Sequence, residues 1–102
     1  MPNIEMWGFG HMDKFTLTEY QVYAEILRQF NKEPFKNDFV ITIVSSRCFN
    51  GNEAQQPFIR ICSSEQAHTE RIIEILQKIQ KEKGIKFDIE VQPLARFIPA
   101  EK

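Results

Sequence analysis

One pattern of residues occurs twice in this chain, and this repetition limits the folds that the chain can adopt. Gln56–Ile61 (QPFIRI) echoes Met1–Met6 (MPNIEM). Three positions correspond between the two copies: Pro2 and Pro57, Ile4 and Ile59, and Met6 and Ile61. The apolar residues after each proline alternate with period two, which is typical of a half-buried β-strand. Each half, about 1–49 and 56–98, is therefore predicted to open with a strand of the same design.

A helical pattern follows each of these strands. Thr16 and Glu19 can form a capping box ahead of an amphipathic helix over roughly 17–31, and Pro34 stops it. Its predicted core positions are Leu17, Tyr20, Tyr23, Ile26, Leu27 and Phe30. A second helix is predicted to open at Ser63–Gln66 and to end at Gly84. Its predicted apolar positions include Ala67, Ile72, Ile75, Leu76 and Ile79.

Another strand closes each half. Phe39–Val44 is apolar on both faces, which predicts a central strand covered on both sides, and Phe87–Val91 alternates apolar and charged residues. A turn-rich stretch, Asn50–Gln56, separates the two halves. Because a strand–helix–strand crossover within one sheet is right-handed and joins parallel strands, each half is predicted to be a parallel βαβ unit.

The order βαββαβ predicts a single α+β domain of two layers, with a four-stranded mixed sheet and both helices on one face. Two arrangements fit this order: two tandem βαβ units laid antiparallel, and a ferredoxin-like split sheet. Either leaves one face of the sheet bare, and that face would present Asn3, Glu5, Trp7, Phe58, Arg60 and Cys62. Since two of these are large aromatic residues, the bare face predicts assembly into an oligomer.

The composition argues against several classes of partner. With 13 basic and 14 acidic residues the formal net charge is -1, which disfavours nucleic acid. The chain has no run of about 18 apolar residues, so we expect no membrane segment and a cytoplasmic location. Cys48 and Cys62 do not form a Cys-x-x-Cys pair, and His11 and His68 have no partner at ligand spacing. Neither a metal nor another cofactor is expected.

Pro2 is the candidate catalytic residue. If Met1 is removed, Pro2 becomes a terminal secondary amine, which can act as a base. A model α-amino group has a pKa of about 7.7 to 8.0, and burial or a nearby cation lowers it towards the range in which a general base works best. The structural alternative is a proline that simply opens a strand, where it costs no ladder hydrogen bond.

Several short motifs carry a resemblance to a known family. They are Met1-Pro2-x-Ile4, the run from Phe39 through Phe49, Pro57-x-Ile59-x-Ile61, Glu65-Gln66, and Val91-x-Pro93-Leu94-x-Arg96. Together with the doubled βαβ unit, they resemble the tautomerase superfamily, which includes oxalocrotonate tautomerase and macrophage migration inhibitory factor (MIF). The chain is most similar to a small, largely uncharacterised bacterial branch of that fold.

The resemblance implies a homotrimer and an isomerase activity, the keto–enol tautomerisation of a small 2-oxo acid, with Pro2 as base. Cations would hold the substrate carboxylate and the developing enolate charge. Lys14 matches one family cation, but Asp38 and its neighbours stand where the family has another. The residues that can take over are Arg47, Arg60 and Arg96, reaching a Pro2 across a subunit boundary, with Phe49 and Phe97 walling an apolar pocket.

Two other functions stay open on the sequence. The missing cation favours a non-catalytic trimer of the same fold that binds a small acid or a protein. The element order alone allows a ferredoxin-like regulatory module, which would require the first and third strands to lie side by side in parallel. In a purely structural role, Arg60 would pair with Glu5 across neighbouring strands.

Overall fold

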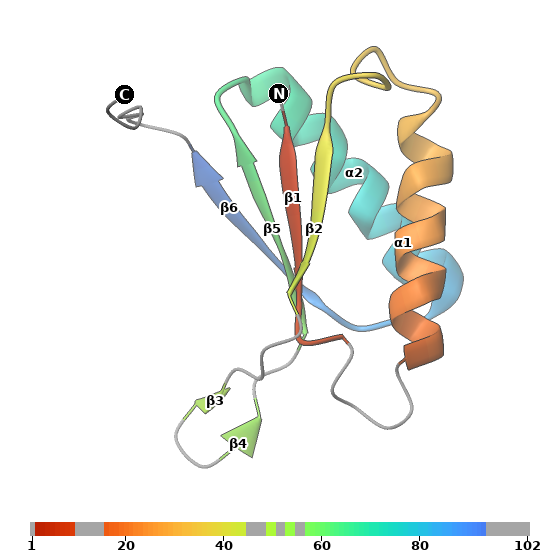
Figure 1. Ribbon diagram of the computed structural model, residues 1–102, viewed down its shortest axis with the longest axis vertical. Coiled ribbons are helices and arrows are strands. Elements are labelled where there is room, and N and C mark those ends of the chain that lie inside the picture. The colour runs from red at the N-terminus through yellow and green to blue at the C-terminus, as the bar shows by residue number, and fades with distance from the viewer. Residues whose placement is uncertain (1, 10–15, 45–48, 51–52, 55–56, 94–102) are drawn as a thin grey trace, which may run out of the picture.

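The computed structural model describes residues 2–9, 16–44, 49–50, 53–54 and 57–93. It has two layers, a four-stranded sheet and two helices that cover one face of it (Figure 1). The elements are β1 (Asn3–Trp7), α1 (Thr16–Phe30), β2 (Val40–Val44), β3 (Phe49–Asn50), β4 (Glu53–Ala54), β5 (Phe58–Ser63), α2 (Gln66–Lys83) and β6 (Asp88–Pro93). The main helices and strands fall where the sequence predicts them. The short antiparallel pair β3–β4, which begins one residue before the predicted turn-rich segment, was not predicted.

The sheet order decides between the two predicted arrangements. The strands lie in the order β2-β1-β5-β6, with β1 parallel to β2, β5 parallel to β6, and β1 antiparallel to β5. The ferredoxin-like alternative needs the first and third major strands to be parallel, and these are antiparallel. The fold is therefore two tandem βαβ units laid antiparallel, as one of the two predicted arrangements required.

The repetition in the sequence extends to matching hydrogen bonds. The carbonyl of Pro2 accepts a hydrogen bond from the N–H of Val40 at 3.0 Å, and the carbonyl of Pro57 accepts one from the N–H of Asp88 at 2.9 Å. Each bond joins the proline ahead of the first strand of a unit to the first residue of its parallel neighbour. The two prolines therefore occupy equivalent places in the two units.

The hydrophobic core lies between the helices and the sheet. Ile4 and Met6 of β1 and Ile59 and Ile61 of β5 are completely buried on the helix-covered face. The helices contribute Val22, Ile26, Phe30, Ile72, Ile75, Leu76 and Ile79. The predicted core role of Tyr20 is wrong, since this side chain is 68% exposed. In α1 the most buried stripe follows Val22, Ile26 and Phe30 at four-residue steps, and Tyr20 lies off that stripe.

Two further sequence predictions need correction. Ala67 is exposed on α2. The second strand was predicted to be central, but β2 is an edge strand, and its Val40 and Ile43 are 38% and 40% exposed. Phe39–Val44 carries β-branched residues on both faces, which is why the sequence predicted a strand covered on both sides. Within one chain, however, the helices cover only one face of the sheet. An apolar edge strand favours pairing with another chain.

A buried carboxylate stabilises α1 and makes the stability depend on pH. Glu25 is 9% exposed and accepts hydrogen bonds from Arg28 Nε and from Gln29 Nε2, both at 3.1 Å. The hydrogen bonds from Arg28 are the main reason that its pKa falls from 4.5 to about 2. Because the folded-state pKa is the lower one, this stabilisation is complete above about pH 4.5 and is lost as the pH falls towards 2.

We expect Glu25→Gln to lower the free energy of unfolding by about 1 kcal/mol at neutral pH, because one partner of a buried charged hydrogen bond is lost. Urea unfolding at a series of pH values should show the difference from wild type largely gone by about pH 2.5. Glu70→Gln, on the exposed Glu70 of α2, is the control and should leave stability nearly unchanged. A gap that stays constant down to acidic pH would contradict the ionic origin.

Candidate functional site

The candidate site lies at the end of the sheet where β1 begins and β5 ends, here called the Pro2 end. The Pro2 side chain is completely buried. Asn3 pairs with Cys62 in the antiparallel ladder, so Ser63, the last residue of β5, lies across from Pro2. Figure 1 shows the start of β1, the end of β5 and the start of α2 at this same end. Pro2 lies at the head of a strand, as predicted, and its burial agrees with the observed place of β1 inside the sheet, between β2 and β5.

A cavity of about 360 Å³ lies one strand away from Pro2. It is lined by Ser63, Ser64, Gln66, Thr69, Glu70 and Val91, from the end of β5, the first turn of α2, and β6. The Oγ of Ser63 accepts a hydrogen bond from the N–H of Glu65 at 3.2 Å, and Thr69 Oγ1 donates to the carbonyl of Glu65 at 3.2 Å. These bonds fix the entry into α2. Among the described residues that line this cavity the one charged side chain is acidic, so within this set a positive potential can come only from the backbone.

The first turn of α2 supplies such a potential. Glu65 is the N-cap residue and makes no side-chain capping hydrogen bond, and the first turn contains no acidic residue. The first N–H groups of a helix have no partner within the helix, and the helix dipole makes this end favourable for anions. The Pro2 end therefore combines a buried proline with backbone donors that suit a carboxylate.

Arg60, the one predicted site arginine that the structure describes, lies on the other face of the sheet. It pairs with Glu5 at 3.2 Å, as the structural alternative predicted, and also with Glu90 at 3.4 Å. Burial alone would lower the pKa of Arg60, but the hydrogen bonds and charges of Glu90 and Glu5 outweigh it and raise the pKa. Alternation along β1 puts Glu5 on the bare face, whereas Ile4 and Met6 face the helices. Arg60 lies opposite Glu5 on β5 and so shares the bare face. Within one chain, the fold does not bring Arg60 to Pro2.

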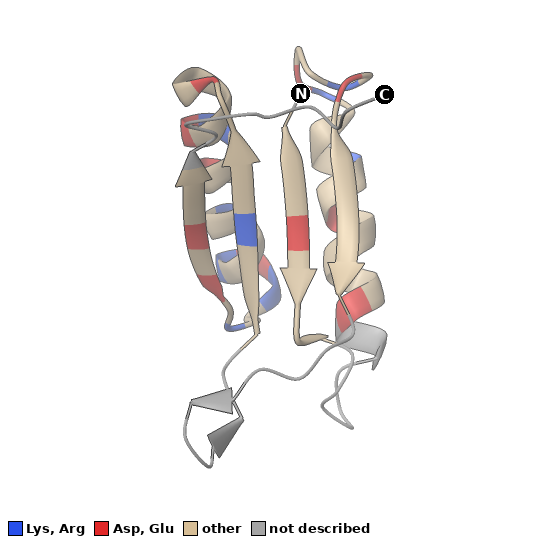
Figure 2. Ribbon diagram, turned by 60° about the vertical axis from the view of Figure 1, so that its left-hand side comes forward, with Lys and Arg blue, Asp and Glu red and all other residues tan. Residues whose placement is uncertain are grey.

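The bare face is well packed around this arginine. The rings of Trp7 and Phe58 stack at 5.6 Å with an interplanar angle of 7°, and Arg60 lies 5.3 Å and 5.5 Å from their centroids. Trp7 also donates from Nε1 to Glu5 at 3.0 Å. Figure 2 shows this face, with charged positions on β1, β5 and β6 and none along β2. Glu5, Trp7, Phe58 and Arg60 thus share one face as predicted and form an aromatic and ionic cluster. The expected exposure of Phe58 is wrong, since this side chain is only 6% exposed.

The remaining predicted site residues fall largely outside the part of the chain that the structure describes. Four of the predicted ligand-binding residues lie outside the described part of the chain: Lys14, Arg47, Arg96 and Phe97. Phe49 opens β3. Cys62 is a free, buried thiol, and burial raises its pKa, which makes it a poor nucleophile.

The polar residues around the start of α2 were missed as site residues. Ser63 and Ser64 were interpreted only as the beginning of a helix, and Thr69 was not singled out. The doubled serine ahead of a helix was the available sequence signal. Within residues 2–9, 16–44, 49–50, 53–54 and 57–93, no cluster of three or more His, Cys, Asp or Glu residues could hold a metal ion, and no helix has the length and apolarity to cross a membrane.

Comparison with known proteins identifies the fold. No protein-family model and no curated protein sequence matches the chain. Among solved structures, a domain of unknown function (DUF1904) from Sebaldella termitidis is similar, with a TM-score of 0.59 and 16% identity, over 92% of this chain and 89% of that one. A macrophage migration inhibitory factor-like protein from Entamoeba histolytica gives a TM-score of 0.52 and 16% identity, over 90% and 83% of the two chains.

A third structure, described as a fused 4-OT wild-type asymmetric trimer, gives a TM-score of 0.56 and 14% identity, over 98% of this chain and 94% of that one. Identities this low show the shared fold alone. The predicted tautomerase/MIF superfamily fold is thereby confirmed.

Proposed function

We propose that this protein, which has the fold of the tautomerase/MIF superfamily, catalyses the keto–enol tautomerisation of a small 2-oxo acid, with Pro2 as the base after removal of Met1. The observation that carries the proposal is the complete burial of Pro2 at the head of the central strand β1. Burial disfavours the ammonium form of an amine, so a terminal Pro2 would be largely neutral and able to accept a proton near neutral pH.

The proposed chemistry moves one proton from carbon to oxygen and needs no further reagent. The neutral amine of Pro2 takes a proton from the carbon next to the keto group, the electron pair of that C–H bond becomes the new C=C bond, and the π pair of the carbonyl moves onto the keto oxygen. The protonated amine then gives the proton to this oxygen, which yields the enol and restores the base. The N–H groups in the first turn of α2, beside Ser63, have no partner within the helix and no bond from the N-cap side chain, so they are suited to hold the substrate carboxylate.

A second candidate is a non-catalytic protein of the same fold that binds a small acid or a protein partner. The observation that favours it is the neutralisation of Arg60 by Glu5 and Glu90 on the face away from Pro2. An arginine held by two carboxylates is poorly placed to stabilise an enolate. In this case the Pro2 end would bind a 2-oxo acid without turning it over.

Two measurements separate these candidates. Mass spectrometry of the protein from its native cell establishes whether Met1 is removed, and an enol–keto assay on phenylpyruvate then measures turnover. Loss of Met1 together with turnover would support catalysis. Retention of Met1, or binding of pyruvate by calorimetry without any turnover of phenylpyruvate, would favour the binding protein.

We further propose that the protein is a homotrimer. The support is the exposed apolar edge β2, next to a sheet face that no helix covers, and the trimeric description of the similar fused 4-OT structure. Sheet edges of this kind are normally paired or blocked.

We expect sedimentation equilibrium of the wild-type protein to give three times the chain mass of 12.0 kDa. Ile43→Lys should shift the population towards monomer, because a half-exposed isoleucine on β2 tolerates a lysine in the monomer but not in an apolar interface. Tyr20→Lys places the same charge on an exposed position of α1 and serves as the control, which should stay trimeric. A monomeric wild type would refute the assembly, and an unchanged Ile43→Lys variant would exclude β2 from the interface.

A further inference from the structure

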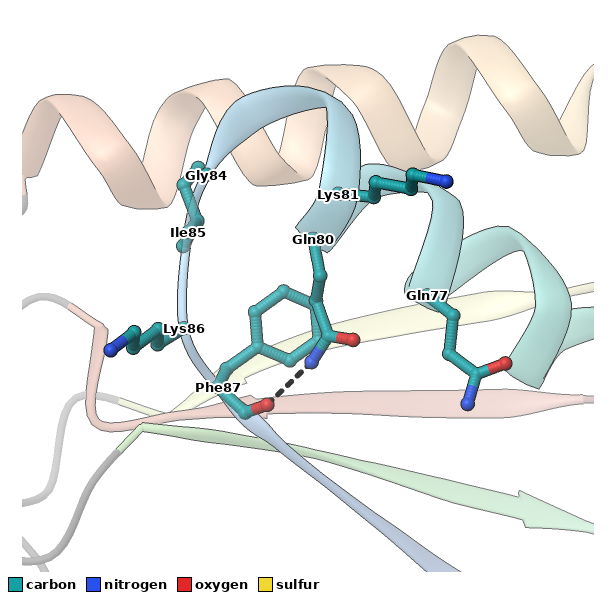
Figure 3. Close-up of a pocket in the computed structure, with 7 residues that line it drawn as sticks. All are labelled: Gln77, Gln80, Lys81, Gly84, Ile85, Lys86 and Phe87. Carbon is teal, nitrogen blue, oxygen red and sulfur yellow. Dashed lines mark hydrogen bonds between the residues drawn. The ribbon is translucent and has the colours of Figure 1, made fainter.

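The molecule has a second cavity, at the end of the sheet away from Pro2. Its volume is about 480 Å³, and it lies between the last turns of α2 and the segment that leads into β6 (Figure 3). This volume falls within the range of small-molecule sites, about 300 to 1,000 Å³. Nothing in the proposed reaction uses this cavity.

The cavity has a fixed framework. Gly84 ends α2 with a φ of 63°, a left-handed conformation that turns the chain sharply away from the helix. The returning segment is tied to the helix by Gln80, whose Nε2 donates to the carbonyl of Phe87 at 2.6 Å. Figure 3 shows this bond closing the loop across the cavity. Phe87 is 3% exposed, and its ring centroid lies 5.7 Å from that of Phe9. This packing fixes the returning segment against the hydrophobic core.

The charge of the lining has one sign. Lys81 and Lys86 line the cavity, and none of the other lining residues that the structure describes is acidic. Figure 3 shows the two lysines extending on opposite sides of the bond between Gln80 and Phe87. Neither lysine makes an ion pair with any acidic group in the part of the chain that the structure describes. Their charges are therefore available to an anion.

The rest of the lining is amphipathic. Gln77 and Gln80 contribute side-chain amides, and the half-buried Ile85 contributes most of the apolar surface, next to the buried Phe87. Apolar walls with a few polar groups are the usual composition of a site for a small organic molecule. A simple inorganic anion would leave this apolar surface unused.

The cavity lies at the position in the second βαβ unit that corresponds to the segment before β2 in the first unit. The N–H of Asp88, the residue after Phe87, binds the carbonyl of Pro57, as the N–H of Val40 binds that of Pro2. Lys86 lies two residues before Asp88, and Asp38 lies two residues before Val40, so Lys86 is the equivalent in the second unit of Asp38 in the first. Pro57 has no terminal amine because it follows Gln56 in the chain, so this end has no equivalent base.

From these observations we infer that the cavity formed by the end of α2 and the approach to β6 binds a small organic carboxylate with an apolar body. The lysines attract the carboxylate from either side, the glutamine amides hydrogen-bond to it, and Ile85 receives the apolar part. Since the lysines are exposed, each contributes modestly and the affinity is weak, with a Kd of about 0.1 to 1 mM. The site is independent of Pro2 and of the proposed reaction.

The test is a titration of ¹⁵N-labelled protein followed by NMR, with phenylacetate as the probe. We expect saturable shifts of the Gln77 and Gln80 side-chain amides and of the Gly84 and Lys86 backbone amides. Two comparison probes should each bind at least about tenfold more weakly than phenylacetate. Phenylacetamide has the same shape without the charge, and inorganic phosphate has charge without an apolar part. The double variant Lys81→Gln/Lys86→Gln should weaken phenylacetate binding about tenfold.

The control variant is Lys32→Gln/Lys36→Gln, which removes the same charge from two exposed lysines after α1 and should leave the affinity within about twofold of wild type. The inference is overturned if phenylacetate gives no saturable shift up to about 20 mM. It is also overturned if phenylacetamide or phosphate binds as well, or if both double variants lose affinity equally. Since Pro2 is untouched in both variants, the outcome does not depend on tautomerase activity.

Discussion

Blocking the amine of Pro2 is expected to abolish most of the turnover of phenylpyruvate while leaving the fold intact. A chain carrying a short N-terminal extension keeps Pro2 in a peptide bond, where its nitrogen can neither take up nor release a proton. A general base contributes about 10²- to 10⁴-fold to a rate, so kcat/KM should fall by this factor relative to protein with Met1 removed. Steady-state assays of the two forms, both characterised by mass spectrometry, provide the measurement.

The matched control carries the same extension at the C-terminus and should keep full activity. Pro2→Ala is the complementary variant. It retains a terminal amine but loses the rigid ring that fills the buried position at the head of β1, so we expect a smaller decrease, near the lower end of the same range. Equal activity of the blocked and processed forms would remove Pro2 from the mechanism and leave the binding function as the better proposal.

The largest effect on stability is expected from Ile61→Ala. Ile61 is completely buried in β5, opposite Ile4 of β1 and next to Val91 of β6. Truncating a buried isoleucine removes its transfer free energy and leaves a cavity, so the free energy of unfolding should fall by about 2 to 5 kcal/mol. This is a large share of the 5 to 15 kcal/mol typical of a whole domain. Urea unfolding at one fixed protein concentration measures the change.

Val91→Ala is the matched control, because Val91 lies in the same row of the sheet but is 44% exposed. It should cost less than about 1 kcal/mol. Comparable losses in the two variants would mean that the core does not lie where the two βαβ units meet.

Much of the fold could be predicted because it depends on local periodicity. The alternation in Asn3–Trp7 and Phe58–Ser63 identifies which side chains face the helices, and Gly84 marks the end of α2. Periodicity does not say which strand lies beside which, so the sequence left two sheet orders open. The prediction of a central Phe39–Val44 was wrong for the same reason: a β-branched run reports apolar surface on both faces, not what covers it.

The candidate site was predictable only in part. Pro2 could be singled out from its place behind Met1, and the pairing of Arg60 with Glu5 from the alternation of facing strands. The second carboxylate on Arg60 comes from Glu90, which the register between β5 and β6 brings alongside. The cavity at the start of α2 likewise needs Val91 of β6 against Thr69 of α2. Such contacts depend on how the second unit closes on itself, which no short motif encodes.

The matching hydrogen bonds of Pro2 and Pro57 have a consequence for the order in which the two units are joined. Each unit closes on itself, and the first strand of one lies antiparallel beside the first strand of the other, so the sheet needs no particular unit to come first. The end of β6 and the start of β1 lie at the same end of the sheet. A circularly permuted chain that begins at Pro57 would keep the same sheet and move the terminal secondary amine to its opposite end, beside the larger, lysine-lined cavity.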